Sequence, residues 1–227
     1  MTDAADRTAR LMALVIERSP RTVAEMIAAS ESSEEDVRFA LAALERHSLV
    51  RWEGAQVRFA HAERDLAEVA EPAMRRLADE SGETVNLMVR SANGAEAIAQ
   101  VDGRHVLGVS NWVGREVPDH CSAAGKVFLA FGGAAPAEPL DRLTARTIVN
   151  AEQLARELEA VREHGFATIV DELEMGLAAV AAPIRDSGGN VVGALSVAGP
   201  TARLGPSRLG LVGRLAIEQA DAVSKAL

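Results

Sequence analysis

The sequence predicts an α+β protein of two domains joined by a linker helix at residues 63–82. Residues 1–62 are expected to form helices and a β-hairpin, and residues 83–227 an antiparallel sheet flanked by helices. Three observations support this prediction. A chain of 227 residues is long for one compact domain and comfortable for two. Apolar residues recur at helical spacing up to about residue 81 and follow a strand-like pattern beyond it. Asn, Asp and Gly separate the first of these later runs, as in β-hairpins.

Composition narrows the class of protein. With 48% hydrophobic and 25% charged residues the chain can bury a core, and no apolar run approaches the roughly 20 residues that a membrane span needs. The N-terminus lacks the basic and apolar regions of a secretory signal, and the single cysteine, Cys121, excludes an intramolecular disulfide. We therefore expect a soluble cytoplasmic protein that does not contact the membrane.

Three helices are expected in the first domain. Residues 7–18 carry apolar positions at helical spacing and form the first helix. Thr22 and Glu25 stand in the T-x-x-E relation of a capping box and open the second helix. Ser33 caps the third helix, whose first turn is acidic and which runs to about His47.

Two short strands, 49–52 and 56–60, follow around a turn at Glu53 and Gly54. Three helices and a hairpin make a winged helix-turn-helix, in which the third helix enters a DNA major groove and the hairpin touches the flanking backbone. A small helical dimerisation domain with the same capping pattern is the alternative.

The candidate DNA contacts are local, because the net charge of the chain is −9. Residues 1–62 hold eight arginines and ten acidic residues, a net charge of −2. Arg38 on the third helix is the candidate for bases or phosphates, and Arg51 and Arg58 on the hairpin are candidates for backbone contacts. Solvated arginines in i,i+4 ion pairs are the alternative for each. Phe39 is a candidate for contact with a thymine methyl group or a protein partner.

An apolar seam marks the linker helix. Leu66, Val69, Ala73 and Leu77 recur at helical spacing, and Gly82 ends the helix. The seam has no obvious partner within so small an N-terminal module. We therefore expect a homodimer formed through the first domain and this helix.

The second domain is expected to mix hairpins with helices. The predicted helices are 122–131, 151–164 and a last one from Pro206, and the predicted strands are 84–91, 97–102, 105–110, 166–172, 177–186 and 191–199.

The segment DHCSAAGKVFLA, residues 119–130, resembles the signature of the IclR family. Residues 157–200 resemble the second conserved block of that family, and SGETVNLMV at 81–89 matches its first effector-domain strand. The resemblance spans about residues 20–225. It implies a GAF-like sheet flanked by helices that senses a small organic acid or aromatic metabolite, in dimers or dimers of dimers (a homotetramer) bound to operator DNA.

The N-terminal segment differs from the family pattern in two places. Family recognition helices usually carry an arginine where this sequence has Phe39, and they open with a basic or small polar residue where it has Glu34, Glu35 and Asp36. These differences support a second hypothesis beside that of a transcription regulator: a metabolite-binding interaction protein that has lost sequence-specific DNA binding.

The start of the 122–131 helix is a candidate carboxylate site. The first N–H groups of a helix lack acceptors within it and lie at the positive end of its dipole, and small side chains let a ligand reach them. Ser122, Ala123, Ala124 and Gly125 offer this arrangement. A capped helix packed closely through small residues is the alternative, and the family resemblance favours effector binding.

Relatives that bind very small oxo-acids imply further polar contacts. By position, the acidic contact falls on Ile169 or Val170, the cysteine on Ala179, and two serines on Ser196 and Ala198, so Ser196 alone is retained. A buried ligand oxygen without a partner costs about 1–3 kcal/mol. The effector is therefore expected to have an apolar or aromatic body and a carboxylate head. The residues expected around the body are Val106, Val109, Leu177 and Trp112.

No catalytic, metal or cofactor site is expected. His120 and Cys121 are adjacent, so on an extended strand they point to opposite faces and cannot act as a nucleophile–base pair. The five histidines lack ligand-like spacing, and SGGN at 187–190 lacks the Lys and helix of a P-loop. The leading hypothesis is a regulator whose ligand binds the DNA-competent and incompetent arrangements with different affinity. Repressor and activator both remain open.

Overall fold

The computed structural model describes residues 10–11, 13–14, 21–30, 32–46, 49–106, 108–132 and 139–227, without the side chains of residues 21, 51, 53 and 58–65. The chain divides into two compact units, Met1–Leu66 and Ala67–Leu227. Each unit has a hydrophobic core of its own.

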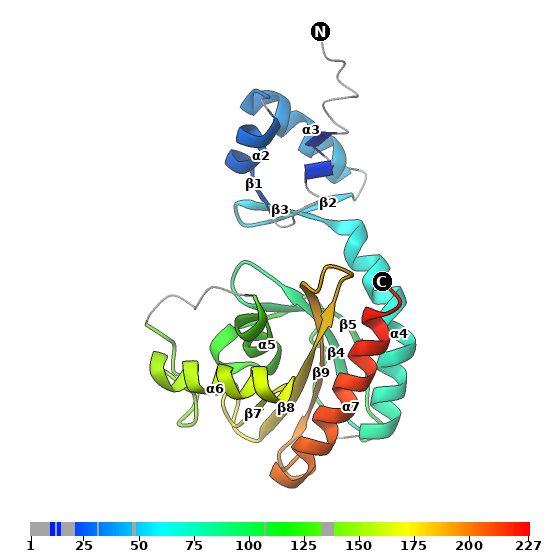
Figure 1. Ribbon diagram of the computed structural model, residues 1–227, viewed down its shortest axis with the longest axis vertical. Helices are drawn as coiled ribbons and strands as arrows, with labels where there is room; N and C mark the ends of the chain where they lie inside the picture. Colours follow the sequence, from blue (N-terminus) through cyan, green and yellow to red (C-terminus); the bar gives the residue numbers. More distant parts are fainter. Residues whose placement is uncertain are drawn as a thin grey trace. The chain divides into compact units, whose positions relative to one another are not determined.

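The first unit is a winged helix-turn-helix, as predicted (Figure 1). Helices α2 (Val23–Ser30) and α3 (Glu34–Arg46) precede the hairpin of β2 (Val50–Glu53) and β3 (Gln56–Phe59). A short strand that the sequence did not indicate, β1 (Arg21–Thr22), pairs with β3 in the order β1-β3-β2. The core consists of buried apolar side chains from the helices and the hairpin: Leu11, Val23, Met26, Val37, Ala40, Leu41, Leu44, Val50 and Val57.

Side-chain caps explain where α2 and α3 begin. Thr22 Oγ1 accepts from the N–H of Glu25 at 3.2 Å, and Glu25 Oε2 accepts from the N–H of Thr22 at 2.8 Å, which is the predicted capping box. Ser33 Oγ accepts from the N–H of Asp36 at 3.1 Å. Of the helix expected at 7–18, residues 10, 11, 13 and 14 are described, and they are helical.

Helix α4 (Ala60–Ser81) follows β3 directly and contains the boundary between the two units. Three residues of the predicted seam are buried along it, with Leu66 5% exposed, Ala73 2% and Leu77 0%, and Val69 is half-buried. Arg76 Nε on the same helix donates to Gln219 Oε1 at 3.0 Å within the second unit. The chain itself thus buries three of the four seam positions, and the homodimer stays a prediction.

The second unit is built on a six-stranded antiparallel sheet in the order β6-β5-β4-β9-β8-β7. Its strands are β4 (Thr84–Arg90), β5 (Ala95–Val101), β6 (Glu116–Val117), β7 (Ala167–Val170), β8 (Leu177–Arg185) and β9 (Val191–Pro200). Helices α5 (Ala123–Phe131) and α6 (Ala151–His164) cover one face, and α4 and α7 (Pro206–Ser224) the other (Figure 1).

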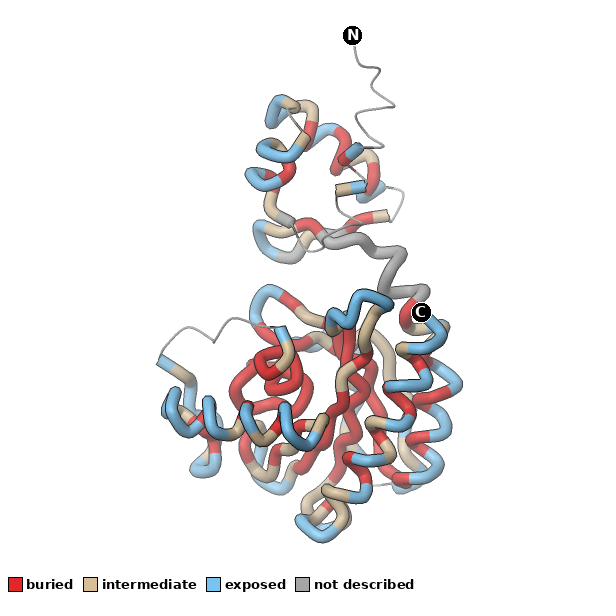
Figure 2. Tube along the Cα trace, viewed as in Figure 1, coloured by how far each residue is buried: buried red, intermediate tan, exposed pale blue. Residues whose placement is uncertain are grey.

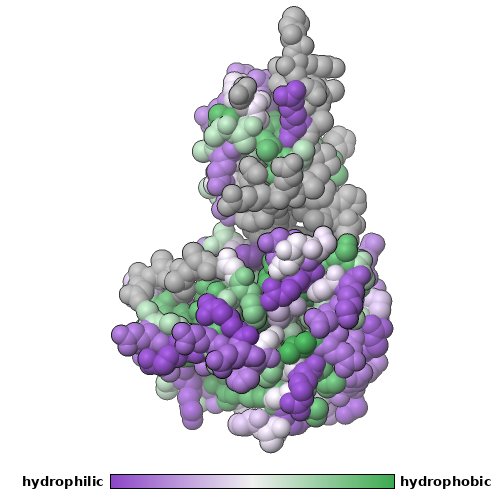
Figure 3. All heavy atoms as spheres, in the orientation of Figure 1, coloured by the Kyte–Doolittle hydropathy of each residue, from purple (hydrophilic) through white to green (hydrophobic). Residues whose placement is uncertain are grey.

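Burial follows these layers. Buried residues concentrate in the sheet and in α5, whereas α6 and α7 alternate between buried and exposed positions (Figure 2). Hydrophilic side chains cover the outer sides of α6 and α7 on the face drawn in Figure 3. The predicted cap of α6 is present, since Gly165 ends it in the left-handed conformation at φ 79°.

The strand expected at 105–110 does not form. The described residues of this segment lie in an irregular connection, and Val106 is fully exposed. The edge of the sheet is instead occupied by β6, which pairs with β5 at Ala95 and Glu96. The connection meets β5 through a single bridge between Val113 and Ala97, and Val109 and Trp112 pack against the core from it.

Candidate functional site

A pocket of about 50 Å³ lies between the start of α5, the sheet and the connection that carries Trp112. Ten of the residues proposed for effector binding line it: Val109, Trp112, Ser122, Ala123, Ala124, Ile169, Leu177, Ala179, Ser196 and Ala198. Strand pairing explains why residues distant in sequence meet, because Ile169 is paired with Ala179, and Ala179 with Ala198. The walls are mainly apolar.

Three residues proposed for this site do not line the pocket. Val106 is fully exposed in the connection that replaces the expected strand. Val170 follows Ile169 on β7, so its side chain points to the opposite face of the sheet. A Cβ at Gly125 would overlap the backbone of Asp119, and the N–H of Gly125 already donates to Ser122 Oγ at 3.1 Å.

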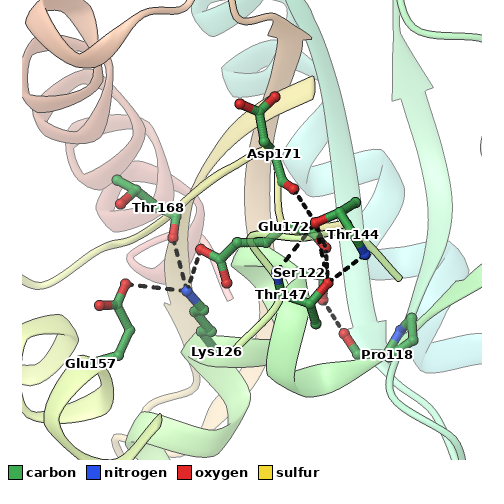
Figure 4. Close-up of polar contacts among 9 residues, drawn as sticks. All are labelled: Pro118, Ser122, Lys126, Thr144, Thr147, Glu157, Thr168, Asp171 and Glu172. Atoms are coloured by element: carbon green, nitrogen blue, oxygen red, sulfur yellow. Dashed lines mark hydrogen bonds and ion pairs between the residues drawn. The ribbon is translucent and has the colours of Figure 1, made fainter. Parts of the chain in front are cut away.

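The start of α5 forms the polar end of the pocket. Ser122 caps the helix, and its hydroxyl also donates to the carbonyl of Pro118 at 2.7 Å (Figure 4). The amides of Ala123 and Ala124 belong to the first turn, where N–H groups have no acceptor within the helix. Both alanines line the pocket, so an anion there lies at the positive end of the helix dipole.

Four lining residues were not proposed from the sequence: Asn86, Met88, Val117 and Leu173. Asn86 is the informative one, because it is 5% exposed and its Oδ1 has no hydrogen-bond partner. Trp112 Nε1 is also buried without a partner. A polar residue in the middle of the apolar run TVNLMV was the sequence signal for Asn86, since strand alternation turns it to the same face as Met88.

A buried ion cluster lies one turn further along α5. Lys126 is fully buried, and its Nζ lies 2.8 Å from Glu172 Oε1, 3.1 Å from Glu157 Oε1 and 3.3 Å from the carbonyl of Thr168 (Figure 4). Burial raises the pKa of Glu172 above its usual value, although the neighbouring Lys126 acts in the opposite direction. The cluster joins α5, α6 and the segment after β7.

The segment after β7 closes one side of the pocket through Leu173. Thr147 Oγ1 donates to the carbonyl of Glu172 at 2.7 Å, and Thr144 Oγ1 donates to that of Asp171 at 2.5 Å (Figure 4). Asp171 has a φ of 61°, and its Oδ1 accepts from the N–H of Gly176 at 2.6 Å. These bonds connect the pocket wall to the segment that carries Thr144 and Thr147.

The adjacent His120 and Cys121 do not form a reactive pair. His120 Nε2 lies 2.9 Å from the carbonyl oxygen of Asp141. Cys121 is buried, and burial, together with the charge of Glu172, raises the pKa of its thiol to about 12. In the described part of the chain no group of three His, Cys, Asp or Glu residues could hold a metal ion, and no helix there is long and apolar enough to cross a membrane.

The residues proposed for DNA contact lie in the first unit. Arg38 and Phe39 are both exposed on α3, and Phe39 is 74% exposed. Arg38 Nε lies 2.8 Å from Glu34 Oε1, which is the i,i+4 ion pair weighed as the alternative. Arg51 and Arg58 are paired across β2 and β3, and their side chains lie outside the description.

The family model described as bacterial transcriptional regulator IclR C-terminal matches residues 59–225. The HTH-type transcriptional repressor AllR of Klebsiella pneumoniae is 37% identical over 173 residues, which cover 72% of this chain and 62% of that protein. AllR of Escherichia coli strain K12 is 35% identical over 170 residues, with coverage of 72% and 63%. The chain thus spans less than two thirds of the length of these relatives.

Solved structures of IclR-family proteins are similar to this chain. The crystal structure of Thermotoga maritima IclR matches with a TM-score of 0.67 at 22% identity and covers 98% of both chains, which shows the fold of both units. The C-terminal domain of Escherichia coli KdgR matches with a TM-score of 0.61 at 29% identity, covering 71% of this chain and 97% of that one. The larger unit therefore has the GAF-like fold of the IclR C-terminal domain. The chain belongs to the IclR family of bacterial transcriptional regulators.

Proposed function

We propose that this chain is a DNA-binding transcription regulator that senses a small carboxylate with an apolar body. The observation that carries the proposal is the pocket at the start of α5, where the amides of Ala123 and Ala124 meet apolar walls. The AllR relatives are HTH-type transcriptional repressors, which supports the regulatory role.

The lining residues set the kind of carboxylate. Ile169 and Ala179 occupy positions where relatives that bind small oxo-acids are expected to have an acid and a cysteine, and both line the pocket. Each buried methylene-sized group of the ligand contributes about 0.8 kcal/mol. The pocket volume of about 50 Å³ favours a small ligand.

Thermal melting at equal ligand concentration tests this assignment. Isovalerate is expected to raise Tm more than glyoxylate or pyruvate, because ligand that binds only the folded state stabilises it by mass action. Ala123→Leu should abolish the shift by blocking the amides, whereas Ala222→Leu on the exposed side of α7 should preserve it. Ser196→Ala should weaken it. A larger shift with the small oxo-acids contradicts the assignment.

For DNA, we propose that α3 contacts the operator through Arg38. The Arg38–Glu34 pair is exposed, and exposed pairs contribute little, so the arginine can exchange Glu34 for a base or phosphate. Arg38→Ala is expected to weaken operator binding by about 1–3 kcal/mol. Arg75→Ala is the matched control, since Arg75 forms the same i,i+4 pair with Glu71 in the second unit. Equal operator binding by the unmodified chain, Arg38→Ala and Arg75→Ala would mean that Arg38 does not contact the operator.

A second candidate is a metabolite-binding interaction protein without DNA recognition. The exposed Phe39 and the net charge of −2 over residues 1–62 favour it. A gel-shift assay with the DNA upstream of the gene, at low and at physiological salt, separates the two functions. A regulator gives a specific complex at both salt concentrations, and the alternative gives none at physiological salt.

Homo-oligomer formation is also proposed, from the family resemblance and the two-fold symmetry of operators. Sedimentation at micromolar concentration is expected to show a dimer or a dimer of dimers. A monomer would exclude reading of a palindromic operator by two copies of the chain.

A further inference from the structure

Two unsatisfied polar atoms lie in the wall of the candidate effector pocket. Asn86 Oδ1 is an acceptor without a donor, and Trp112 Nε1 is a donor without an acceptor. Both residues line the pocket, and Asn86 is 95% buried. Buried polar groups are nearly always hydrogen-bonded in folded proteins, so this pair indicates a ligand that supplies the missing partners.

Both side chains are held at the pocket by the surrounding structure. Asn86 lies in the centre of the sheet, with Gln100 of β5 and Ser196 of β9 as its cross-strand neighbours. The backbone N–H of Trp112 donates to Gln100 Oε1 at 3.0 Å, and the Arg115 guanidinium lies 5.7 Å from the centre of the indole ring. The backbone positions of both residues are therefore fixed before a ligand binds.

We propose that Asn86 and Trp112 select effectors that carry a hydroxyl group in addition to the carboxylate. A hydroxyl is the smallest group that both donates and accepts, so it offers the donor that Asn86 Oδ1 lacks and the acceptor that Trp112 Nε1 lacks. The inference rests on the proposed function, in which the amides of Ala123 and Ala124 hold the carboxylate. The chemical class is a compact hydroxycarboxylate.

Matched ligands isolate the hydroxyl. Isovalerate has the carboxylate and the apolar body, 2-oxoisovalerate adds an acceptor, and 2-hydroxyisovalerate adds a donor and an acceptor. Butyrate and 3-hydroxybutyrate form a second pair, in which the hydroxyl lies one carbon further from the carboxylate. In titration calorimetry with the full chain, we expect the better of the two hydroxy acids to bind about ten-fold more tightly than its deoxy analogue. The oxo acid should fall between the hydroxy and deoxy forms of the isovalerate series.

Variants then locate the effect. Trp112→Phe removes the N–H and keeps an aromatic ring, and Asn86→Leu replaces the amide by an apolar group of similar size. Each is expected to reduce the preference for the hydroxyl, measured as the ratio of the two dissociation constants within one protein. This ratio is insensitive to any general loss of stability. Trp52→Phe in the first unit is the control, and it leaves Trp112 as the sole tryptophan, whose fluorescence reports binding independently.

The outcomes separate the two proposals. Equal binding of hydroxy and deoxy acids, or a preference unchanged in both variants, overturns the role of Asn86 and Trp112 and leaves the carboxylate sensor standing. Failure of every carboxylate to bind overturns the proposed effector and this inference with it. A hydroxyl preference that is retained in Trp52→Phe and lost in Trp112→Phe and Asn86→Leu supports the selection of a hydroxycarboxylate.

Discussion

Lys126 is a buried cation whose two carboxylate partners come from different elements. Removing one partner of a buried ion pair leaves an uncompensated charge, so Lys126→Met is expected to lower the free energy of unfolding by about 3–5 kcal/mol. Lys225→Met is the matched control, because Lys225 is exposed and should change it by less than about 0.5 kcal/mol. Urea denaturation measures both. Equal stability of the two variants would mean that the cluster contributes nothing.

The buried thiol of Cys121 is expected to make the stability of the protein depend on pH. Burial raises the pKa of its thiol from 9.0 to about 12, so between these values the unfolded state loses the proton and the native state keeps it. The contribution of this group to stability is therefore fully present below pH 9 and falls as the pH rises toward 12. Thiol reagents at pH 8 should label the protein in urea and leave the native protein unlabelled. Rapid stoichiometric labelling of the native protein would contradict the burial of Cys121.

At the level of elements, local signals predicted local structure. The capping box at Thr22 and Glu25 and the terminating Gly165 marked helix ends correctly, because the atoms involved lie within a few residues of one another. The strand expected at 105–110 did not form, and the edge strand β6 pairs with β5 at Ala95 and Glu96 instead. Whether a segment pairs as a strand depends on the neighbouring strands of the whole sheet, and the periodicity of one segment carries no information about those neighbours.

The candidate site divides in the same way. The helix start at Ser122 to Ala124 and the strand position at Ala179 were predicted from motif and resemblance, and all of them line the pocket. Trp112 was expected there, but Asn86 was not proposed. Its Oδ1 stands out only because no donor in the folded chain reaches it, and a sequence does not show this. Lys126 illustrates the same limit, since a lysine in sequence predicts an exposed side chain.

The first turn of α5 packs against the backbone of Asp119, and this contact requires a residue without a Cβ at position 125. A methyl group at Gly125 would overlap the backbone of Asp119, which cannot rotate away as a side chain can. Gly125→Ala is expected to cost about 1–3 kcal/mol of stability and to weaken carboxylate binding, because the first turn must move. Gly132→Ala at the end of the same helix meets no atom within 4 Å and should be nearly neutral. Urea denaturation and ligand titration measure these effects. Equal stability and equal ligand affinity of Gly125→Ala and Gly132→Ala would mean that the close packing at Gly125 is not required.

At the scale of the whole molecule, the pocket belongs entirely to the second unit. All of its lining residues lie between Asn86 and Ala198, and this unit has its own core. We therefore propose that a chain beginning at Ala60, the start of α4, folds and binds the carboxylate with a Kd within about two-fold of the full chain. It should not bind operator DNA, because α3 is absent. A large loss of ligand affinity would mean that the first unit contributes to the pocket.

Regulation requires the two units to be coupled in the full chain. The effector can change operator affinity only if it binds the DNA-competent and incompetent states with different free energies. By linkage, the factor by which saturating effector changes operator Kd must equal the factor by which operator changes effector Kd. We expect this factor to lie between about 5 and 150, measured by fluorescence anisotropy of labelled operator and by calorimetry of the complex. A factor of one, with both ligands bound, would mean that the pocket binds a metabolite without controlling DNA binding.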